Sequence, residues 1–465
     1  MGFIMDGLDA EEYDRSYNDR ELVKRILRYF RPQLGRMLLV SAMILLTSLV
    51  NTGLPIAISS AVDRLQEDSS TETVLLYTAI VIALGCLGWG LNAIRQRASS
   101  IAVGNVVLNL REDAFDAVLA RDLSFYDSIP SGKIVSRVTS DTQALSQIVT
   151  LTMDLMSQIL LIFLLIGYLF SVDAQLTLIT LALAPFIVIT ALAFRKIARE
   201  TVTQSRRILA VVSAHIQETV SGIGVAKTFR QEHTVYDEFL DVNKQSYRIN
   251  LRTGYVFNAI FPILNLLAGF GTAALVYFGG IRAQDGGLSA GDWFLFIQGL
   301  NLFWFPLTSI ASFWSQFQLG LAAGERVFAL IDAEPRVVQT GNDRLDLVMG
   351  EITFENVNFH YNEDEPVLQD FSLTIHAGET LALVGHTGSG KSSLARLIAR
   401  FYEFQDGHIL IDGHDIRSLD LANYREHLGI VTQSPFLFDG TVRDNIRYGS
   451  PNATDDEVLA VVQSV

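Results

Sequence analysis

The sequence has almost no cysteine: Cys86 is the single one among 465 residues, so no disulfide can form within the chain. Charged residues are also scarce, at 18% against about 25% in a typical soluble protein, whereas apolar residues reach 49%. The mean hydropathy is +0.31. These values argue against a disordered chain and against an ordinary soluble globule, and they indicate an integral membrane protein.

Positive charge is deficient as well. Lys and Arg number 35 against 50 Asp and Glu, which gives a formal charge of −15 and an isoelectric point near 5.0. Nucleic acids are bound by basic surfaces, so a nucleic acid is not expected as a partner. Residues 1–20 are acidic and hold no apolar core of the kind that a cleavable signal peptide needs.

Long apolar runs occupy the first two thirds of the chain. A helix that crosses a membrane needs about 20 consecutive apolar residues. Six runs of this kind occur, at about 38–60, 74–94, 148–170, 174–194, 255–279 and 292–320. Pro306 and several polar residues interrupt the sixth run, which predicts a helix that packs against others or faces a pore. One such run alone also fits a buried core helix, but six in one chain favour six membrane spans.

The charges of the connecting segments set the orientation of these spans. Basic clusters precede the first span and follow the second and the fourth, whereas the turn after the first span is acidic. Because basic loops stay on the cytoplasmic side, both termini are predicted to be cytoplasmic. Within residues 20–36, one helical face carries apolar side chains between basic residues: Leu22, Val23, Ile26, Leu27 and Phe30. This pattern predicts an amphipathic helix on the membrane surface; the alternative is the frayed start of span one.

Two connections, 95–147 and 195–254, are much longer than the others. Both keep apolar residues at helical spacing, so we expect the transmembrane helices to continue well beyond the bilayer. Each connection is broken once, at 129–132 and at 221–224. A short helix at each break is predicted to contact the domain that lies below the membrane, and a plain helical hairpin without a partner is the alternative.

The composition changes after the sixth run. Residues 331–335 are predicted to connect the last helix to a linker. Over 351–360, apolar and polar residues alternate as they do in a strand. The short apolar run 380–384 is typical of a buried parallel strand. It leads into the motif G-x-x-x-x-G-K-S at 385–392, and a helical pattern follows over 393–401.

The Gly-rich motif has the residues that bind the phosphates of a nucleotide. Its glycines let backbone N–H groups wrap around phosphate oxygens, and the following helix directs its positive dipole end toward them. Lys391 adds a full charge toward the β- and γ-phosphates, and the Ser392 hydroxyl can ligate Mg²⁺. The His386 side chain is expected to face solvent. The candidate cofactor-binding residues of this segment are Gly385, His386, Thr387, Gly388, Ser389, Gly390, Lys391, Ser392 and Ser393.

Together with the apolar runs, this motif resembles the pattern of ATP-binding-cassette (ABC) transporters of the exporter type, over almost the whole chain from about residue 20. Two stretches of the C-terminal part resemble the glutamine loop of the family and the segment after it: 430–435 and 438–446. Stretches of the long connections resemble the family's two intracellular loops: 125–132, 136–141 and 217–229.

The resemblance assigns roles to two further residues. Tyr361 would stack on the adenine of ATP, and Gln433 would ligate Mg²⁺ or water and sense the γ-phosphate at the interface with the membrane domain. Gln433 and Lys391 are therefore the candidate catalytic residues, and Ser392 and Gln433 are the candidate Mg²⁺ ligands. The plainer interpretations are an ordinary aromatic at a strand end for Tyr361 and a solvated loop side chain for Gln433.

The predicted architecture is an α-helical transmembrane domain of six spans with long cytoplasmic extensions, followed by an incomplete α/β P-loop nucleotide-binding domain. We place an N-terminal tail at 1–19, the six-helix exporter domain at 20–330, a linker at 331–350 and a partial ATP-binding cassette at 351–465.

Several motifs that the resemblance implies are missing. The L-S-G-G-Q signature, the strand that ends in Asp beside the catalytic Glu, and the switch His do not occur after Gln433. We therefore expect a truncated gene product or a sequence fragment that binds nucleotide without hydrolysing it; a deliberately short regulatory variant is the alternative. Because the strands that would flank 380–384 are missing too, we expect the isolated segment 340–465 to be unstable and to aggregate.

The resemblance implies a half-transporter that pairs with a second half, identical or not, because each ATP lies between one phosphate loop and the partner's signature. ATP binding and hydrolysis would turn a membrane cavity from inside-facing to outside-facing and back. The implied activity is ATP-driven export of a lipid, drug, peptide or similar substrate across the cell membrane. The alternatives are a nucleotide-gated channel on the same fold and a nucleotide-binding subunit without turnover. Intramembrane charge would favour the channel, and little is present apart from Asp154, near the cytoplasmic end of span three.

Overall fold

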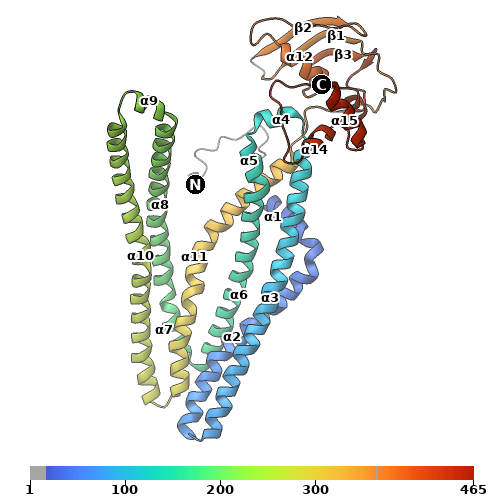
Figure 1. Cartoon of the computed structure of the whole chain (residues 1–465). Coiled ribbons are helices and arrows are strands. Elements are labelled where there is room, and N and C mark those ends of the chain that lie inside the picture. Colours follow the sequence, from blue (N-terminus) through green and yellow to red (C-terminus); the bar gives the residue numbers. More distant parts are fainter. Residues whose placement is uncertain (1–16, 363–364) are drawn as a thin grey trace. The chain divides into compact units, whose positions relative to one another are not determined.

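The computed structural model describes residues 17–362 and 365–465 (Figure 1). The chain divides into two compact units. The membrane unit comprises the described residues up to Ala120 together with Pro130–Ala333, and the C-terminal unit comprises Arg121–Ile129 together with Glu334–Val465. The short segment Arg121–Ile129, which interrupts the first unit in sequence, thus belongs to the second.

The membrane unit is built from long helices (Figure 1). Their bounds are α1 (Asp19–Phe30), α2 (Leu34–Glu67), α3 (Thr71–Leu119), α5 (Ser131–Ser136), α6 (Thr142–Val172), α7 (Ala174–Ala182), α8 (Ala184–Ser221), α9 (Ile223–Thr228), α10 (Glu232–Gln284) and α11 (Ala290–Asp332), with the short turns η1 (Arg31–Gln33) and η2 (Arg137–Asp141) between neighbours. With 49 residues in α3 and 53 in α10, these helices far exceed the roughly 20 residues that a bilayer requires, which confirms the predicted extensions.

Five helical segments among the described residues are long and apolar enough to cross a membrane. They are Arg20–Glu67, Thr71–Leu119, Ser131–Val172, Ala174–Ser221 and Glu232–Gln284. These segments contain the first five predicted spans. The sixth predicted span lies in α11, which continues as a helix through Pro306 but is not one of the five. The count of six spans therefore stays a prediction.

Within the membrane unit, α2, α3, α6 and α11 pack together, and α8 and α10 form a long antiparallel pair that α9 closes at one end (Figure 1). Apolar side chains fill the contact between α6, α10 and α11, where Leu165, Leu275 and Phe296 are fully buried. The short helix α9 lies where the second break was predicted. Likewise, α4 (Leu123–Ser128) lies directly before the first break.

The amphipathic helix predicted near the N-terminus forms as α1. Leu22 and Phe30 are buried on its apolar face. Arg25 forms an ion pair with Asp332 at the end of α11, and its guanidinium carbon lies 4.4 Å from the centroid of the Phe328 ring. The helix is thus fastened to the last helix of its own unit, and its placement on a membrane surface stays a prediction.

The C-terminal unit contains an antiparallel sheet with the strand order β2-β1-β3-β4. The strands are β1 (Ile352–His360), β2 (Pro366–Ile375), β3 (Asp406–Ile411) and β4 (His414–Asp415), and the helices are α4, α12 (Lys391–Ile398), α13 (Leu421–Glu426), α14 (Val442–Arg447) and α15 (Asp455–Ser464). The alternation predicted over 351–360 is confirmed by β1, which buries Phe354, Val357 and Phe359 in the core beneath α12 and α13.

The buried parallel strand predicted at 380–384 does not form, and this prediction was wrong. The segment has neither strand nor helix, and Val384 exposes 89% of its surface. The glutamine segment is similar, since 429–433 is irregular and Val431 is 99% exposed. A parallel strand is stable when neighbouring strands pair with it and both its faces are covered. No strand within residues 17–362 and 365–465 pairs with either segment.

The segment predicted as a linker is packed into the C-terminal unit. The Thr340 amide donates to the Arg417 carbonyl at 3.0 Å, and an isolated parallel bridge joins Asp343 to Leu419. Leu345 is buried in the same core as the sheet. Residues 334–350 therefore contribute to the fold of this unit, and they do so after α11 ends at Asp332, as predicted.

Candidate functional site

The phosphate-loop candidate turns sharply onto the N-terminus of α12, which begins at Lys391. Gly388 and Gly390 have φ angles of +88° and +86°, in the left-handed region that costs residues with a Cβ atom energy. At Gly385 the limit is space, because a Cβ there would lie 2.6 Å from Ser389 Oγ. The backbone conformation thus favours glycine at 388 and 390, whereas a Cβ at 385 would require the Ser389 side chain to move.

Lys391 is held over the same loop. Its Nζ donates to the carbonyls of Gly385 at 3.0 Å and His386 at 2.7 Å, and to Ser389 Oγ at 3.2 Å. The ammonium group and the positive end of the α12 dipole therefore act on one small region, which is the electrostatic requirement for binding a phosphate. The His386 side chain is exposed, as expected, with Nδ1 2.9 Å from the Thr387 carbonyl.

The two serines that follow Lys391 differ in their surroundings. Ser392 is exposed at the start of α12, whereas Ser393 is buried. The Ser393 hydroxyl lies 3.0 Å from Tyr361 Oη. The structure thus brings two candidate cofactor-binding residues, Tyr361 and Ser393, together, and it leaves Ser392 exposed to solvent.

Tyr361 belongs to an aromatic cluster beside α12. Its ring packs edge-to-face on Phe359, with centroids 4.8 Å apart, and on Tyr402, with centroids 5.1 Å apart. Arg396 of α12 donates to Tyr361 Oη at 3.3 Å, and its guanidinium carbon lies 5.7 Å from the centroid of the Tyr402 ring. The orientation of Tyr361 is therefore set by two rings and by α12.

Gln433 is not brought to the phosphate loop. All residues of 429–440 are exposed, and in the described part of the chain no hydrogen bond joins Gln433 to Lys391 or Ser392. The same part of the chain holds no group of three or more His, Cys, Asp and Glu side chains that could bind a metal by itself. A divalent cation here would need the oxygens of a bound phosphate, as is common for Mg²⁺.

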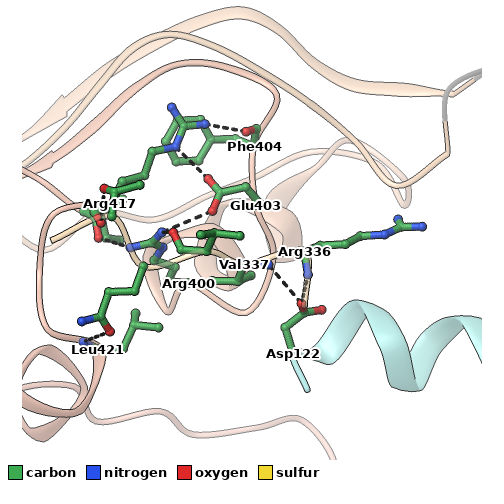
Figure 2. Close-up of polar contacts among 12 residues, drawn as sticks. Asp122, Arg336, Val337, Arg400, Glu403, Phe404, Arg417 and Leu421 are labelled. Atoms are coloured by element: carbon green, nitrogen blue, oxygen red, sulfur yellow. Dashed lines mark hydrogen bonds and ion pairs between the residues drawn. The ribbon is translucent and has the colours of Figure 1, made fainter. Parts of the chain in front are cut away.

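Sequence reasoning missed the residues that fasten α4 to this unit. Asp122, the N-cap of α4, accepts hydrogen bonds at Oδ2 from the backbone amides of Arg336 at 2.5 Å and Val337 at 3.0 Å (Figure 2). At the other end of α4, Asp127 accepts a hydrogen bond from the Tyr402 hydroxyl. The carboxylates lie far from 336–402 in sequence, so only a contact between distant segments reveals them.

Burial and hydrogen bonding act in opposite directions on the pKa of Asp122. Burial of the carboxyl raises the pKa, whereas the hydrogen bonds from Ser124, Val337 and Arg336 lower it. The hydrogen bonds outweigh burial, so the pKa of Asp122 lies below its ordinary value. The folded state therefore favours the ionised carboxylate that binds these amides.

Arg400, also missed, lies directly after α12 and is buried with a left-handed φ of +50°. It donates to the Val338 carbonyl at 2.8 Å, to the Ile416 carbonyl, and to Glu403, with which Arg417 also pairs at 2.8 Å (Figure 2). Hydrogen bonds thus join the end of α12 to the start of α4 through residues 336–338: Arg400 binds the Val338 carbonyl, and the amides of Arg336 and Val337 bind Asp122.

Comparisons with known proteins agree with this arrangement. The profile of the ABC transporter transmembrane region matches residues 37–307, and the profile of the ABC transporter family matches residues 368–465. An uncharacterized ABC transporter ATP-binding protein of Bacillus subtilis, YknV, is 32% identical over 95% of this chain and 74% of its own length.

Two further relatives are named for a substrate. An ATP-dependent lipid A-core flippase of Syntrophus aciditrophicus is 29% identical over 96% of this chain and 74% of its own length. A fatty acid ABC transporter ATP-binding/permease protein of Mycobacterium bovis is 32% identical over 84% of this chain and 62% of its own length. The extent of these matches, together with the apolar helices and the phosphate loop, shows that this multi-pass membrane protein belongs to the ABC transporter family.

Proposed function

We propose that this chain is one half of an ATP-driven exporter that acts as a dimer, with ATP binding coupled to alternating access of a membrane cavity. The observation that carries the proposal is a phosphate loop with left-handed glycines and a central lysine, in one chain with five helices long enough to cross a membrane. The relatives support an ATP-driven transporter, since one is named an ATP-dependent flippase and another a fatty acid ABC transporter.

The residues at the loop fit a Mg²⁺-nucleotide. The backbone at 385–390 and the ammonium group of Lys391 would bind the phosphates, and the exposed Ser392 hydroxyl would ligate Mg²⁺ together with phosphate oxygens. Tyr361 would supply the face on which adenine stacks. Gln433 would complete the Mg²⁺ site and position water only after 429–440 folds against the loop.

A lipid-like substrate with a polar group is our proposal for the cargo. A hollow of about 650 Å³ lies between α3 and α6, at the level where both helices leave the apolar part of their spans. An ion pair of 2.9 Å between Arg95 and Asp154 lies at one end of the hollow. Hydroxyl and amide side chains extend the polar lining, among them Ser99, Gln143, Ser146 and Thr150.

The same ion pair disfavours the nucleotide-gated channel. A cation pathway presents uncompensated carboxylates to the pore, whereas Asp154 is neutralised by Arg95. We further propose the division into a tail at 1–19, a six-span domain at 20–330, a connecting segment at 331–350 that packs with the cassette, and a cassette at 351–465. The protein would lie in the cell membrane with both termini in the cytoplasm.

The test is equilibrium binding of ATP in the presence of Mg²⁺ to the full chain in lipid nanodiscs. Lys391→Ala removes the charge that faces the phosphates, and hydrogen bonds to charged groups contribute about 1.5–3 kcal/mol. We therefore expect the affinity to fall by about tenfold or more. The control is His386→Ala in the same loop, which keeps the backbone groups that would bind phosphate and removes only an exposed imidazole that lies 2.9 Å from the Thr387 carbonyl. This variant should change the affinity little. Equal affinity of the Lys391→Ala variant and the wild type would contradict the proposal.

A further inference from the structure

The short helix α4 is held to the C-terminal unit by a carboxylate at each end. Asp122 binds the backbone amides of Arg336 and Val337, and Asp127 binds the hydroxyl of Tyr402. The chain continues from α4 into α3 on one side and into α5 on the other. A conformational change in the C-terminal unit can therefore reach α4 through these two carboxylates. Because α4 is covalently continuous with α3 and α5, the change can pass on to the membrane helices.

Tyr402 contacts both α4 and the candidate base-stacking residue Tyr361. Its hydroxyl donates to Asp127, while its ring meets the Tyr361 ring at 5.1 Å and 89°. Tyr402 is 4% exposed, so neighbouring side chains leave its ring little room to turn. Phe359 packs against the same pair of rings, at 4.8 Å from Tyr361 and 6.1 Å from Tyr402.

The helix of the phosphate loop contacts both rings as well. Ser393 Oγ and Arg396 Nη1 lie within hydrogen-bond distance of Tyr361 Oη, at 3.0 Å and 3.3 Å. Burial of Tyr402 and its bond to Asp127 raise the pKa of the phenol, so its hydroxyl stays a donor over the physiological range. A continuous set of contacts thus runs from α12 through Tyr361 and Tyr402 to α4.

We propose that Tyr402 is a positioning residue that couples occupancy of the base platform at Tyr361 to the position and order of α4. The inference rests on the proposed function, because it takes Tyr361 as the surface on which the base stacks. A base stacked on Tyr361 would restrict that ring, the edge-to-face contact would restrict Tyr402, and the hydroxyl of Tyr402 would restrict Asp127. Coupling of this kind requires that bound and free states differ in these contacts.

The experiment measures amide hydrogen exchange of residues 123–129 in the full chain in nanodiscs, with and without saturating ATP and Mg²⁺. In the wild type we expect ATP to slow exchange in this segment by at least threefold. Tyr402→Phe removes only the hydroxyl, so we expect ATP affinity within about threefold of the wild type and loss of the ATP-dependent slowing. Asp127→Ala removes the acceptor of the same hydrogen bond and lies outside the sheet core. It should also abolish the ATP-dependent slowing, and it serves as the test if Tyr402→Phe misfolds.

The matched control is Tyr424→Phe. It also removes the hydroxyl of a buried tyrosine, and this hydroxyl donates to the Ile398 carbonyl of α12 at 2.7 Å instead of to Asp127. This variant should keep the ATP-dependent slowing, which separates coupling from a general loss of stability. ATP binding without any change in α4, or slowing that persists in both Tyr402→Phe and Asp127→Ala, would overturn the inference and leave the proposed function intact. Failure of the wild type to bind ATP would instead overturn the proposed function, and this inference with it.

Discussion

Two parts of the C-terminal unit near the phosphate loop, the antiparallel sheet and residues 380–384, differ sharply in strand pairing and burial. In the antiparallel sheet β2-β1-β3-β4 each strand pairs with its neighbours, with irregularities in the β1 ladders, and Phe354 and Ile409 are buried almost completely. The segment 380–384, which leads into the loop, is equally apolar in sequence but is unpaired and exposed. Antiparallel neighbours join through short connections, whereas parallel neighbours come from distant parts of the chain. This holds for β1 and β2, but β3 pairs with β1 although α12 lies between them in sequence. The sheet differs from 380–384 because its strands have pairing partners among the described residues, whereas 380–384 has none there.

The largest effect on the free energy of unfolding is expected from a substitution in the core of the antiparallel sheet. Phe354 is 1% exposed, and removing a buried phenylalanine costs about 3–5 kcal/mol of unfolding free energy. We therefore expect Phe354→Ala to raise exchange of the β3 amides strongly in the full chain. Val384→Ala, in the unpaired segment, should change the free energy of unfolding by less than about 0.5 kcal/mol. Equal costs for the two would mean that 380–384 is packed in solution.

A smaller effect is expected where the loop meets α12. Gly390 has a φ of +86°, so a Cβ there adds about 1 kcal/mol of backbone strain. If binding needs this conformation, Gly390→Ala should weaken ATP affinity by roughly fivefold. The control is Gly429→Ala, since Gly429 has no positive φ and nothing lies within 4 Å of a Cβ placed there. An unchanged affinity for Gly390→Ala would show that binding uses another loop conformation.

The smallest effect concerns the pH dependence of the α4 contact at Asp122. The pKa of this carboxyl is lowered in the folded state, so its stabilisation is fully present above the unfolded pKa of about 3.9 and is lost as the pH falls through the folded value. After correction for intrinsic rates, protection of the α4 amides should be constant from pH 7 to about pH 4 and decrease below. Asp122→Asn should remove this decrease, whereas Asp346→Asn at an exposed site should keep it. A wild-type decrease that begins near pH 6 would contradict the assignment to Asp122.

The sequence predicted the elements whose evidence is local. The apolar runs located the first five long helices, the alternation at 351–360 located β1, and the spacing of the Gly-rich motif located the loop before α12. The two short helices near 129–132 and 221–224 followed from breaks in helical patterns. The roles of Tyr361 and Gln433 stay predictions, as does the instability of the isolated segment 340–465, which the exposed Val384 and Val431 support.

The sequence could not predict contacts between distant segments. Asp122 and Asp127 are ordinary helix-end carboxylates in the sequence, and nothing in their neighbourhood indicates Val337 or Tyr402 as partners. The buried strand at 380–384 was predicted wrongly for the same reason, because an apolar run records a tendency to be buried and says nothing about which strand pairs with it.

By itself, then, the amino-acid sequence determined the membrane character of the chain and the chemistry of the phosphate loop, since both depend on residue types within about 20 consecutive positions. The tertiary structure alone decided that α4 belongs with the nucleotide-binding unit and that Tyr402 lies between Tyr361 and Asp127. The physical reason is that hydrogen bonds and ring contacts act over a few ångströms of space, which sequence separation does not measure.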